Sequence, residues 1–570
     1  MLKKLSLLLP ILLILTSLSS WKNNHGHTDY EKTEKQWVDS VYNSLTQRER
    51  IGQLFMVAAY SNKDEAHVRS VEKLIQDYKI GGLIFFQGGP GRQINILNRL
   101  QKAANVPLLI GFDGEWGLGM RLDSTYSYPR QMTLGAIQDD KLIYQMGEQI
   151  AEQCSRVGIH VNFAPVVDIN VNPKNPVIGM RSFGENKEKV ATKGSLYMQG
   201  MQDNRVIACA KHFPGHGDTD KDSHKALPVI NHSKERIEEV ELYPFRALIA
   251  DSLGSVMVAH LSVPSLDKRP NRATTLSYKV VTGMLKEDLG FKGLIFTDAM
   301  NMKGVSKYFE PGEADLEAFL AGNDVMLFPK NVPDAVNRIE KALKNGDVTE
   351  KDFSKRVKKI LSAKYWSGAS HFTPISVKNI NKDVKNKKYE ALIQKLYEAS
   401  VTVVRNEDNL LPIQIIDTNR FASLTIGKRT SPTFRTRLSK YAQFKHFHWN
   451  GENQEQYQTI LKQLKSYSIV VVGLTSMNSS ASKRFGVSNT ANKFLFDLEK
   501  QNRVITVAFG NPYGLKYLDT HENVICTYQK NKYTLDIAPQ VIFGALGASG
   551  RLPVSASINV KEGAGVTIKK

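Results

Sequence analysis

The chain has 570 residues and a formal net charge of +20, and a length of this order predicts two to four domains, of which we favour two. A positive charge suits anionic partners, but Lys and Arg are spread along the chain and form no nucleic-acid-binding motif or basic-aromatic cluster. We therefore expect no nucleic-acid partner. The three cysteines, Cys154, Cys209 and Cys526, are too few and too widely spaced to indicate a disulfide framework, so each is expected to be a small buried side chain.

The N-terminus has the features of a secretory signal peptide. Lys3 and Lys4 precede an apolar stretch over residues 5–15, and Ser17-Leu18-Ser19 follows as a small-x-small cleavage site. The alternative is a membrane anchor, but the apolar run is shorter than the ~20 residues that span a bilayer. We expect residues 1–20 to be removed. The mature protein is then exported to the periplasm, cell envelope or exterior of a bacterium, without stable membrane insertion.

Eight short apolar, β-branched runs follow, each succeeded by a helical pattern. They are residues 51–58, 82–86, 107–112, 160–167, 206–210, 255–259, 293–297 and 324–328. Apolar strands that alternate with helices indicate a parallel sheet covered on both faces, and eight in series predict a (β/α)8 barrel of the TIM type over residues 21–365. Ionisable residues come directly after several of these strands, on the face where such barrels build active sites. They are Asp113, Asp168, Lys211, His212, His260 and Asp298.

A second strand-helix series follows a polar, lysine-rich segment at residues 366–388, which we interpret as a linker. Its five apolar runs are residues 401–404, 422–426, 468–473, 504–509 and 524–528. Five strands are too few to close a barrel. They predict an open, doubly wound sheet in a smaller α/β sandwich domain over residues 389–560.

The segment KHFPGHGDTDKDSH, at residues 211–224, concentrates ionisable side chains on one loop after the fifth strand. These are His212, His216, Asp218, Asp220, Asp222 and His224. A zinc site is one interpretation, because His and carboxylate are ligands that zinc favours. However, neither the HExxH nor the CxxC spacing is present. We therefore predict no metal and no other cofactor.

Two parts of the sequence offer groups for acid-base and nucleophilic chemistry. Asp222 and His224 are two residues apart, a spacing that lets the carboxylate orient the imidazole and favour its protonated form, as a general acid requires. Asp298 lies at the tip of the seventh apolar run, within TDAMNM at residues 297–302. A lone carboxylate at that position is either a nucleophile or a metal ligand.

Together these motifs resemble glycoside hydrolase family 3. KHFPGHGDTDKDSH and TDAMNM occur with GFDGEWGLGMR at residues 111–121 and APVVDINVNPKNPVIGMRSFG at residues 164–184. The resemblance is strong from residue 51 to about 361. It continues more weakly through LLPI at residues 410–413 and GRLPVS at residues 550–555. Within the family, the chain is similar to the β-N-acetylglucosaminidase (β-N-acetylhexosaminidase) branch.

The resemblance implies a retaining enzyme that removes a terminal β-linked N-acetylhexosamine through a covalent glycosyl-enzyme, with Asp298 as nucleophile and Asp222 and His224 as the acid/base pair. It also implies that four residues hold the hydroxyls of the sugar: Asp113, Arg181, Lys211 and His212. Charged heads of this kind bind hydroxyls through charge-assisted hydrogen bonds. For Arg181 the alternative is a salt bridge, for example to Asp168.

Other residues in these motifs are given lesser roles. We expect His260 and Asp168 to be part of the scaffold, whereas Trp116 either stacks on sugar or fills the core. One departure from the family concerns Trp116 and its neighbours, because the chain has Gly-Glu-Trp-Gly at residues 114–117 where many relatives have Gln-Glu-Gly-Gly. The preferred aglycone is therefore open.

Two alternative functions are weighed against the resemblance. A family-3 β-glucosidase or xylosidase takes its acid/base glutamate from the second domain, so the Asp222 and His224 pair argues against it. A non-catalytic sugar-binding barrel has no need of both Asp298 and His224. The expected partner is an oligosaccharide containing N-acetylglucosamine, either a muropeptide of peptidoglycan recycling or a chitin fragment, and transfer to phosphate instead of water stays open.

Overall fold

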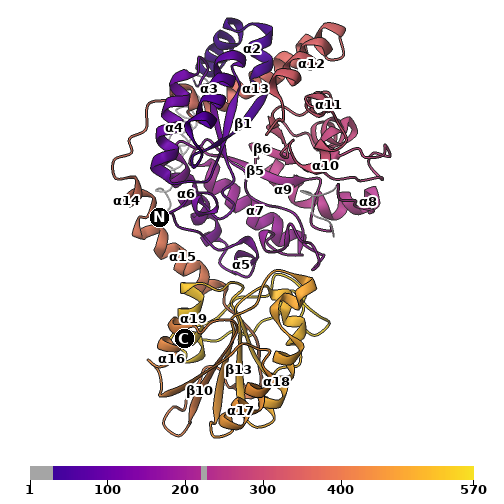
Figure 1. Ribbon diagram of the computed structural model, residues 1–570. Coiled ribbons are helices and arrows are strands. Elements are labelled where there is room, and N and C mark those ends of the chain that lie inside the picture. Colours follow the sequence, from indigo (N-terminus) through magenta and orange to yellow (C-terminus); the bar gives the residue numbers. More distant parts are fainter. Residues whose placement is uncertain (1–29, 220–226) are drawn as a thin grey trace, which may run out of the picture.

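The computed structural model describes residues 30–219 and 227–570, except the side chain of Asp408. Figure 1 shows two domains joined end to end, with helix α15 passing from the first to the second. The predicted signal peptide, Asp222 and His224 lie outside the described residues. Within the described residues, no helix combines the length and the apolar composition needed to cross a bilayer.

Eight parallel strands form the first domain. They are β1 (Phe55–Tyr60), β2 (Gly82–Phe86), β3 (Leu109–Phe112), β4 (Val161–Asn162), β5 (Ile207–Phe213), β6 (Ser255–Val258), β7 (Leu294–Thr297) and β8 (Met326–Leu327). From β1 to β7, each strand pairs with the next in sequence, and β8 pairs with β1. A parallel bridge between Phe296 and Val325 links β7 to the start of β8. The predicted (β/α)8 barrel is confirmed.

Several predicted strand limits were wrong. The first run was placed at residues 51–58, but Gln47–Gly52 is helix α2, because Thr46 and Glu49 form a capping box at its start. The fourth was placed at residues 160–167, but β4 ends at Asn162. Pro165 has no N–H to donate to a neighbouring strand, so the chain continues as a loop.

Helices cover the outside of the barrel (Figure 1). The longer ones are α3 (Glu65–Tyr78), α4 (Pro90–Ala103), α6 (Lys141–Arg156), α7 (Lys187–Gln202), α9 (Tyr243–Ala250), Lys279–Asp288, α11 (Glu313–Ala321), α12 (Val332–Asn345) and α13 (Glu350–Trp366). The shorter ones are α5 (Gln131–Gly135), α8 (Lys234–Arg236) and α10 (Lys303–Ser306). Helix α6 buries Leu142, Met146 and Ile150, which recur every four residues and so lie along one helix face.

The chain leaves the barrel through the lysine-rich segment. A short helical turn over Ala369–His371 and helix α14 (Ile380–Val384) precede α15 (Lys387–Ser400). The predicted linker therefore contains some helical structure, and the domain limits stay predictions.

The second domain has one sheet in the order β11-β10-β12-β13-β14-β9. Its strands are β9 (Thr402–Asn406), β10 (Phe421–Ile426), β11 (Phe444–Trp449), β12 (Ile469–Leu474), β13 (Arg503–Ala508) and β14 (Asn523–Cys526), and its helices are α16 (Pro432–Leu438), α17 (Gln454–Leu464), α18 (Asn489–Glu499) and α19 (Lys532–Ile542). All neighbours are parallel except β14 and β9. The predicted doubly wound sheet is confirmed, but the count of five strands was wrong because it omitted β11.

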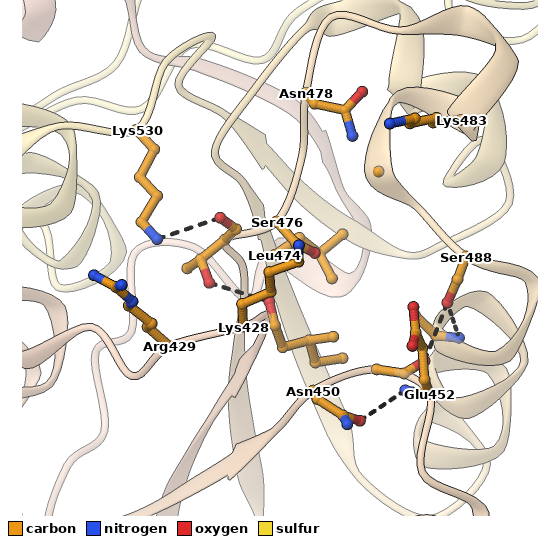
Figure 2. A pocket seen from close by; sticks show the side chains of 15 residues that line it. Lys428, Arg429, Asn450, Glu452, Leu474, Ser476, Asn478, Lys483, Ser488 and Lys530 are labelled. Atoms are coloured by element: carbon orange, nitrogen blue, oxygen red, sulfur yellow. Dashed lines mark hydrogen bonds between the residues drawn. The ribbon is translucent and has the colours of Figure 1, made fainter.

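Strand order in this sheet reverses at β10. The chain passes from β10 to β11 on one side and returns to β12 on the other, so the loops that follow these strands separate at their carboxyl ends. A cavity of about 660 Å³ lies there (Figure 2).

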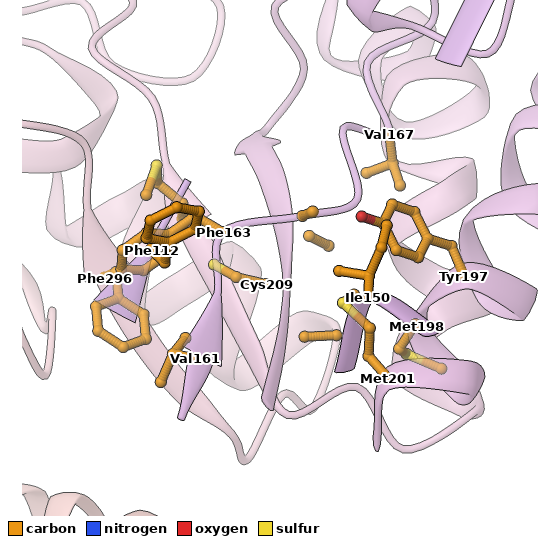
Figure 3. Packing of buried hydrophobic residues seen from close by; sticks show 14 of the residues in the cluster. Phe112, Ile150, Val161, Phe163, Val167, Tyr197, Met198, Met201, Cys209 and Phe296 are labelled. Carbon is orange, nitrogen blue, oxygen red and sulfur yellow. The ribbon is translucent and has the colours of Figure 1, made fainter. Parts of the chain in front are cut away.

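Buried apolar side chains fill the barrel and the layer beneath its helices (Figure 3). In one group, the rings of Phe163 and Phe296 pack edge to face with their centroids 5.2 Å apart. Gly111 makes room for Phe163, because a Cβ at residue 111 would lie 2.8 Å from its ring. In the other group, Tyr197 of α7 packs near Ile150 of α6. All three cysteines are buried and free, which confirms their predicted role as small core side chains.

Candidate active site

A cavity of about 490 Å³ opens at the carboxyl ends of the barrel strands. The predicted site residues that the structure describes all line it: Asp113, Arg181, Lys211, His212 and Asp298. Other polar residues to which we assigned no role also line it, among them Glu115, Arg121 and His216. The structure thus brings together residues from four different strand-end segments.

Asp298 is held at the end of β7 by backbone hydrogen bonds. Its N–H donates to the carbonyl of Val258 at 2.9 Å, and its Oδ1 accepts from the N–H of Ala299 at 2.8 Å. His260 braces the same turn, because its ring nitrogens lie 2.7 Å from Thr275 Oγ1 and 3.1 Å from the carbonyl of Ala299. These contacts fit the scaffold role predicted for His260.

The charges around Asp298 keep its carboxyl ionised. Burial by itself would raise the pKa of Asp298, but His260, His212, the Ala299 N–H and Lys211 outweigh burial and hold the pKa below its ordinary value. An ionised carboxylate at the carboxyl end of a barrel strand is suited to nucleophilic attack.

Lys211 joins two carboxylates in the floor of the cavity. Its Nζ lies 3.0 Å from Asp113 Oδ1 and 2.9 Å from Glu115 Oε1, and its side chain is 3% exposed. Arg121 Nη2 contacts the other oxygen of Asp113 at 2.6 Å. Burial would raise the pKa of Asp113, but Lys211 and Arg121 keep it below its ordinary value.

Arg181 extends this network through Glu115. Its Nε and Nη2 donate to the two oxygens of Glu115 at 2.9 and 2.7 Å, a bidentate pair. Its Nη2 also lies 3.3 Å from His212 Nε2. We considered a salt bridge for Arg181, for example to Asp168. Arg181 does form a salt bridge, but its partner is Glu115.

Asp168 lies beneath the histidines and orients them. Its Oδ2 is 2.7 Å from His212 Nδ1, and its Oδ1 accepts from the backbone N–H of His212 at 3.1 Å and of His216 at 2.7 Å. The carboxylate therefore fixes the imidazole of His212 with Nε2 toward the cavity. This is the scaffold role predicted for Asp168.

Loop contacts across the barrel set the position of Glu115. Asn162, the last residue of β4, exchanges two side-chain hydrogen bonds with the backbone of Gly114, at 2.9 and 3.2 Å. The hydroxyl of Tyr197 in α7 donates to the carbonyl of Gly114 at 3.1 Å. A Cβ at residue 114 would lie 2.9 Å from Asn162 Oδ1, so a larger residue there would displace the Asn162 side chain.

His216 borders the cavity, and one of its two ring nitrogens can form a further hydrogen bond. Its Nδ1 lies 3.0 Å from Thr219 Oγ1, and among the described residues its buried Nε2 has no hydrogen-bond partner. Burial lowers its pKa to about 4, so the ring is neutral near pH 7 and can donate to or accept from a ligand.

Trp116 is partly buried, packs against the core and borders the cavity. The guanidinium of Arg130 lies over its indole, 4.2 Å from the ring centroid. Trp116 also borders a second hollow, of about 340 Å³, with residues of both domains. The departure from the family pattern at residues 114–117 therefore lies where the linings of the two cavities meet.

Within the described residues, no three His, Cys, Asp or Glu side chains are grouped as a metal site. Residues 220–226, which include Asp222 and His224, lie outside the described residues.

Sequence comparison decides the family. Residues 46–363, more than half of the chain, match the family model described as the glycosyl hydrolase family 3 N-terminal domain. The chain belongs to glycosyl hydrolase family 3.

Two curated relatives and one solved structure extend this family-3 assignment. Beta-hexosaminidase A of Pseudoalteromonas piscicida is 34% identical over 376 residues, or 60% of this chain and 62% of that protein. The beta-N-acetylglucosaminidase/beta-glucosidase of Cellulomonas fimi is 27% identical over 385 residues, or 66% and 68% of the two chains. The match thus spans less than two thirds of the first relative's length.

A family-3 beta-N-acetylglucosaminidase from Paenibacillus sp. str. FPU-7 has a solved structure that superposes with a TM-score of 0.75 at 28% identity, covering 90% of this chain and all of that one. The names of these three proteins agree with the predicted branch of family 3, and that prediction is confirmed.

Proposed function

We propose that the protein is a retaining exo-β-N-acetylglucosaminidase. The observation that carries the proposal is the carboxylate of Asp298 at the end of β7, which shares one cavity with a network of ion-paired side chains. These are Asp113, Glu115, Arg121, Arg181 and Lys211. Relatives named as hexosaminidases support the choice of sugar.

The network is organised to bind the hydroxyls of one sugar ring. Lys211 uses two N–H groups on Asp113 and Glu115, and its third is available to a ligand. Asp113 and Arg181 remain partly exposed to the cavity, with 16% and 21% of their side chains accessible. Because the charged heads are already paired, they lose little freedom when sugar binds, which favours a fixed orientation of the anomeric carbon toward Asp298.

In the proposed reaction, Asp298 attacks the anomeric carbon while protonated His224 gives its proton to the departing oxygen. A covalent glycosyl-enzyme results. Water then loses a proton to neutral His224 and displaces Asp298, so the configuration is retained. Asp222 orients His224 and favours its charged form.

The two domains together offer a place for the aglycone. The hollow beyond Trp116 is lined by Tyr126 and Arg130 of the barrel domain and by Tyr397 and Tyr533. Aromatic faces bind sugar rings and peptide chains alike, so we propose that the leaving group occupies this hollow. From the N-terminal features we also propose export, with a cell-wall or chitin-type oligosaccharide as substrate.

Turnover of 4-nitrophenyl glycosides tests this function. We expect the β-N-acetylglucosaminide to have the highest kcat/KM in a panel with the galactosaminide, glucoside and xyloside, with no change on exhaustive chelation. If the glucoside or xyloside is hydrolysed faster, the protein is instead a family-3 β-glucosidase or xylosidase. If no glycoside of the panel is hydrolysed, the result favours a non-catalytic sugar-binding barrel. Repeating the assay with phosphate, and analysing the product for sugar 1-phosphate, decides between hydrolysis and phosphorolysis.

A further inference from the structure

One cavity of the second domain lies where its sheet reverses strand order. Most of its lining comes from the loops that follow β10, β11 and β12, at the carboxyl ends of these strands, and Lys530 comes from the loop after β14. Open α/β sheets bind ligands in the crevice at this point, because the two loops on either side of the reversal lead away from each other. The cavity is separate from the barrel site, with which it shares no lining residue.

Four basic side chains line this cavity: Lys428, Arg429, Lys483 and Lys530. The lining contains one carboxylate, that of Glu452. Among the described residues, none of the four forms an ion pair with a carboxylate, and the Nζ of Lys530 has only the carbonyl of Thr475 at 3.3 Å. Burial and the charge of Arg429 lower the pKa of Lys530. Uncompensated cations gathered in one cavity favour an anionic ligand.

The opposite side of the cavity carries neutral and acidic hydrogen-bonding groups. Figure 2 shows Arg429 and Lys530 at one side and Asn450, Glu452 and Ser488 at the other. Asn450 Oδ1 accepts from the backbone N–H of Glu452 at 2.9 Å, which leaves the Asn450 amide and the Glu452 carboxylate for a ligand. Ser488 caps helix α18, so the positive end of that helix dipole faces the same space.

The segments that follow β10 and β12 approach each other closely at this edge of the sheet. Gly427 follows β10 directly, and a Cβ there would lie 2.4 Å from Thr475 Oγ1. Glu452 follows β11, the next strand after β10. In nucleotide-binding sheets, an acid that holds ribose hydroxyls follows the corresponding strand. However, Gly427-Lys428-Arg429-Thr430 is not the glycine-rich fingerprint of a dinucleotide site.

We propose that this cavity binds a small phosphate ester of a sugar or nucleoside, with the phosphate between Lys428, Arg429 and Lys530 and the hydroxyls of the sugar at Asn450 and Glu452. The volume of about 660 Å³ suits a ligand of that size. The proposal does not depend on the activity assigned to the barrel.

Calorimetric titration of the full chain tests the phosphate contacts. The probes are glucose 6-phosphate, adenosine 5′-monophosphate, inorganic phosphate, and unphosphorylated glucose and adenosine. We expect at least one ester to bind, and the triple variant K428A/R429A/K530A to weaken its binding at least tenfold. The control variant K440A/K462A/K465A removes the same charge from exposed lysines outside the cavity and should bind as the parent does. Both variants should keep the parent's turnover in the barrel.

A second variant, Glu452→Gln, tests the hydroxyl contacts. We expect it to weaken binding of the ester severalfold and to leave binding of inorganic phosphate unchanged or stronger. The proposal is overturned if no ester binds, if the two triple variants weaken binding equally, or if Glu452→Gln leaves the ester unaffected. The first outcome means that the cavity binds no such ester. The second means that the substitutions act only through the net charge of the protein. The third means that the cavity binds the phosphate group without contacts to the sugar hydroxyls.

Discussion

At the scale of single residues, Glu115 holds the proposed sugar-binding network together. It is 1% exposed and contacts both Lys211 and Arg181. Burial would raise the pKa of Glu115, but Arg181 and Lys211 hold it well below its ordinary value. The carboxylate is thus charged near pH 7, and it balances two cations that would otherwise repel each other.

Glu115→Gln keeps the shape of this side chain and removes its charge. Removing one partner of a buried ion pair costs about 3 to 5 kcal/mol, so we expect a lower melting temperature and a kcat/KM reduced at least 100-fold. The matched control is Glu188→Gln, at an exposed position in the first turn of α7. Unchanged kcat/KM for Glu115→Gln would show that the network is not needed for substrate binding.

The site residues that the sequence predicted differ from Glu115, which it did not predict, in how far along the chain the residues that position them lie. Asp113, Lys211 and Asp298 come at or directly after the end of apolar strands, so the strand pattern alone predicts that they face the cavity. Glu115 has no such position. Its place depends on Asn162 and Tyr197, which contact Gly114 from 48 and 83 residues away. The only local indication was a second acid two residues beyond Asp113.

At the scale of single elements, helix α11 contains a buried acid that the proposed chemistry does not use. Asp315 is 2% exposed, and among the described residues its Oδ1 has no hydrogen-bond partner. Burial raises its pKa to about 7. In the unfolded chain an aspartate has a pKa of about 3.9, so between about pH 4 and pH 7 the folded state binds a proton that the unfolded state does not. Asp315 therefore makes the protein less stable as pH rises through this window.

Asp315→Asn should remove this pH dependence. We expect the variant to gain stability over the parent from pH 5 to pH 7, and the gain to stay constant above pH 7. Three pKa units correspond to roughly 4 kcal/mol as an upper limit. Thermal unfolding across this range measures the difference, with Asp347→Asn, at an exposed position, as the control. A gain that does not change with pH would show that ionisation of Asp315 is not its cause.

The sequence predicts which segments are strands better than it predicts where each strand begins and ends. Fully apolar runs such as β12, Ile-Val-Val-Val-Gly-Leu, are buried on both faces and can be recognised as strands. Half of the residues of the missed strand β11, Phe-Lys-His-Phe-His-Trp, are polar, because the strand lies at the edge of the sheet and most of its side chains are partly exposed. Its composition therefore lacks the continuous apolar run on which the prediction relied.

At the scale of the whole molecule, the second domain packs against the loops that build the barrel site. Tyr513 donates its hydroxyl to the carbonyl of Asn170 at 2.7 Å and accepts from the Asn170 amide at 3.2 Å. Glu185 contacts the N–H and hydroxyl of Ser555. Asn170 and Glu185 flank the segment that carries Arg181, so the second domain supports that segment. No local pattern in the sequence predicts which surfaces of the two domains meet.

Tyr513→Phe removes one hydroxyl from this interface and leaves the amide and carbonyl of Asn170 without their partner. A buried polar group left unpaired costs about 1 to 3 kcal/mol. We expect a lower melting temperature and a severalfold loss of kcat/KM, because the segment with Arg181 is less firmly held. Tyr517→Phe is the control, since among the described residues the hydroxyl of Tyr517 makes no hydrogen bond. Equal effects of both substitutions would mean that the interface does not support the site.

The central claim is that Asp298 is the nucleophile and His224 the acid/base, and azide rescue with a 2,4-dinitrophenyl β-N-acetylglucosaminide tests it most directly. This leaving group needs no proton, so in His224→Ala the glycosyl-enzyme still forms, and azide attacks it without a general base. We predict that NMR of the product shows the β-glycosyl azide. Asp298→Ala forms no glycosyl-enzyme, and azide that enters the vacated space gives at most the α-glycosyl azide. A β-azide from Asp298→Ala, or no rescue of His224→Ala, would contradict both assignments.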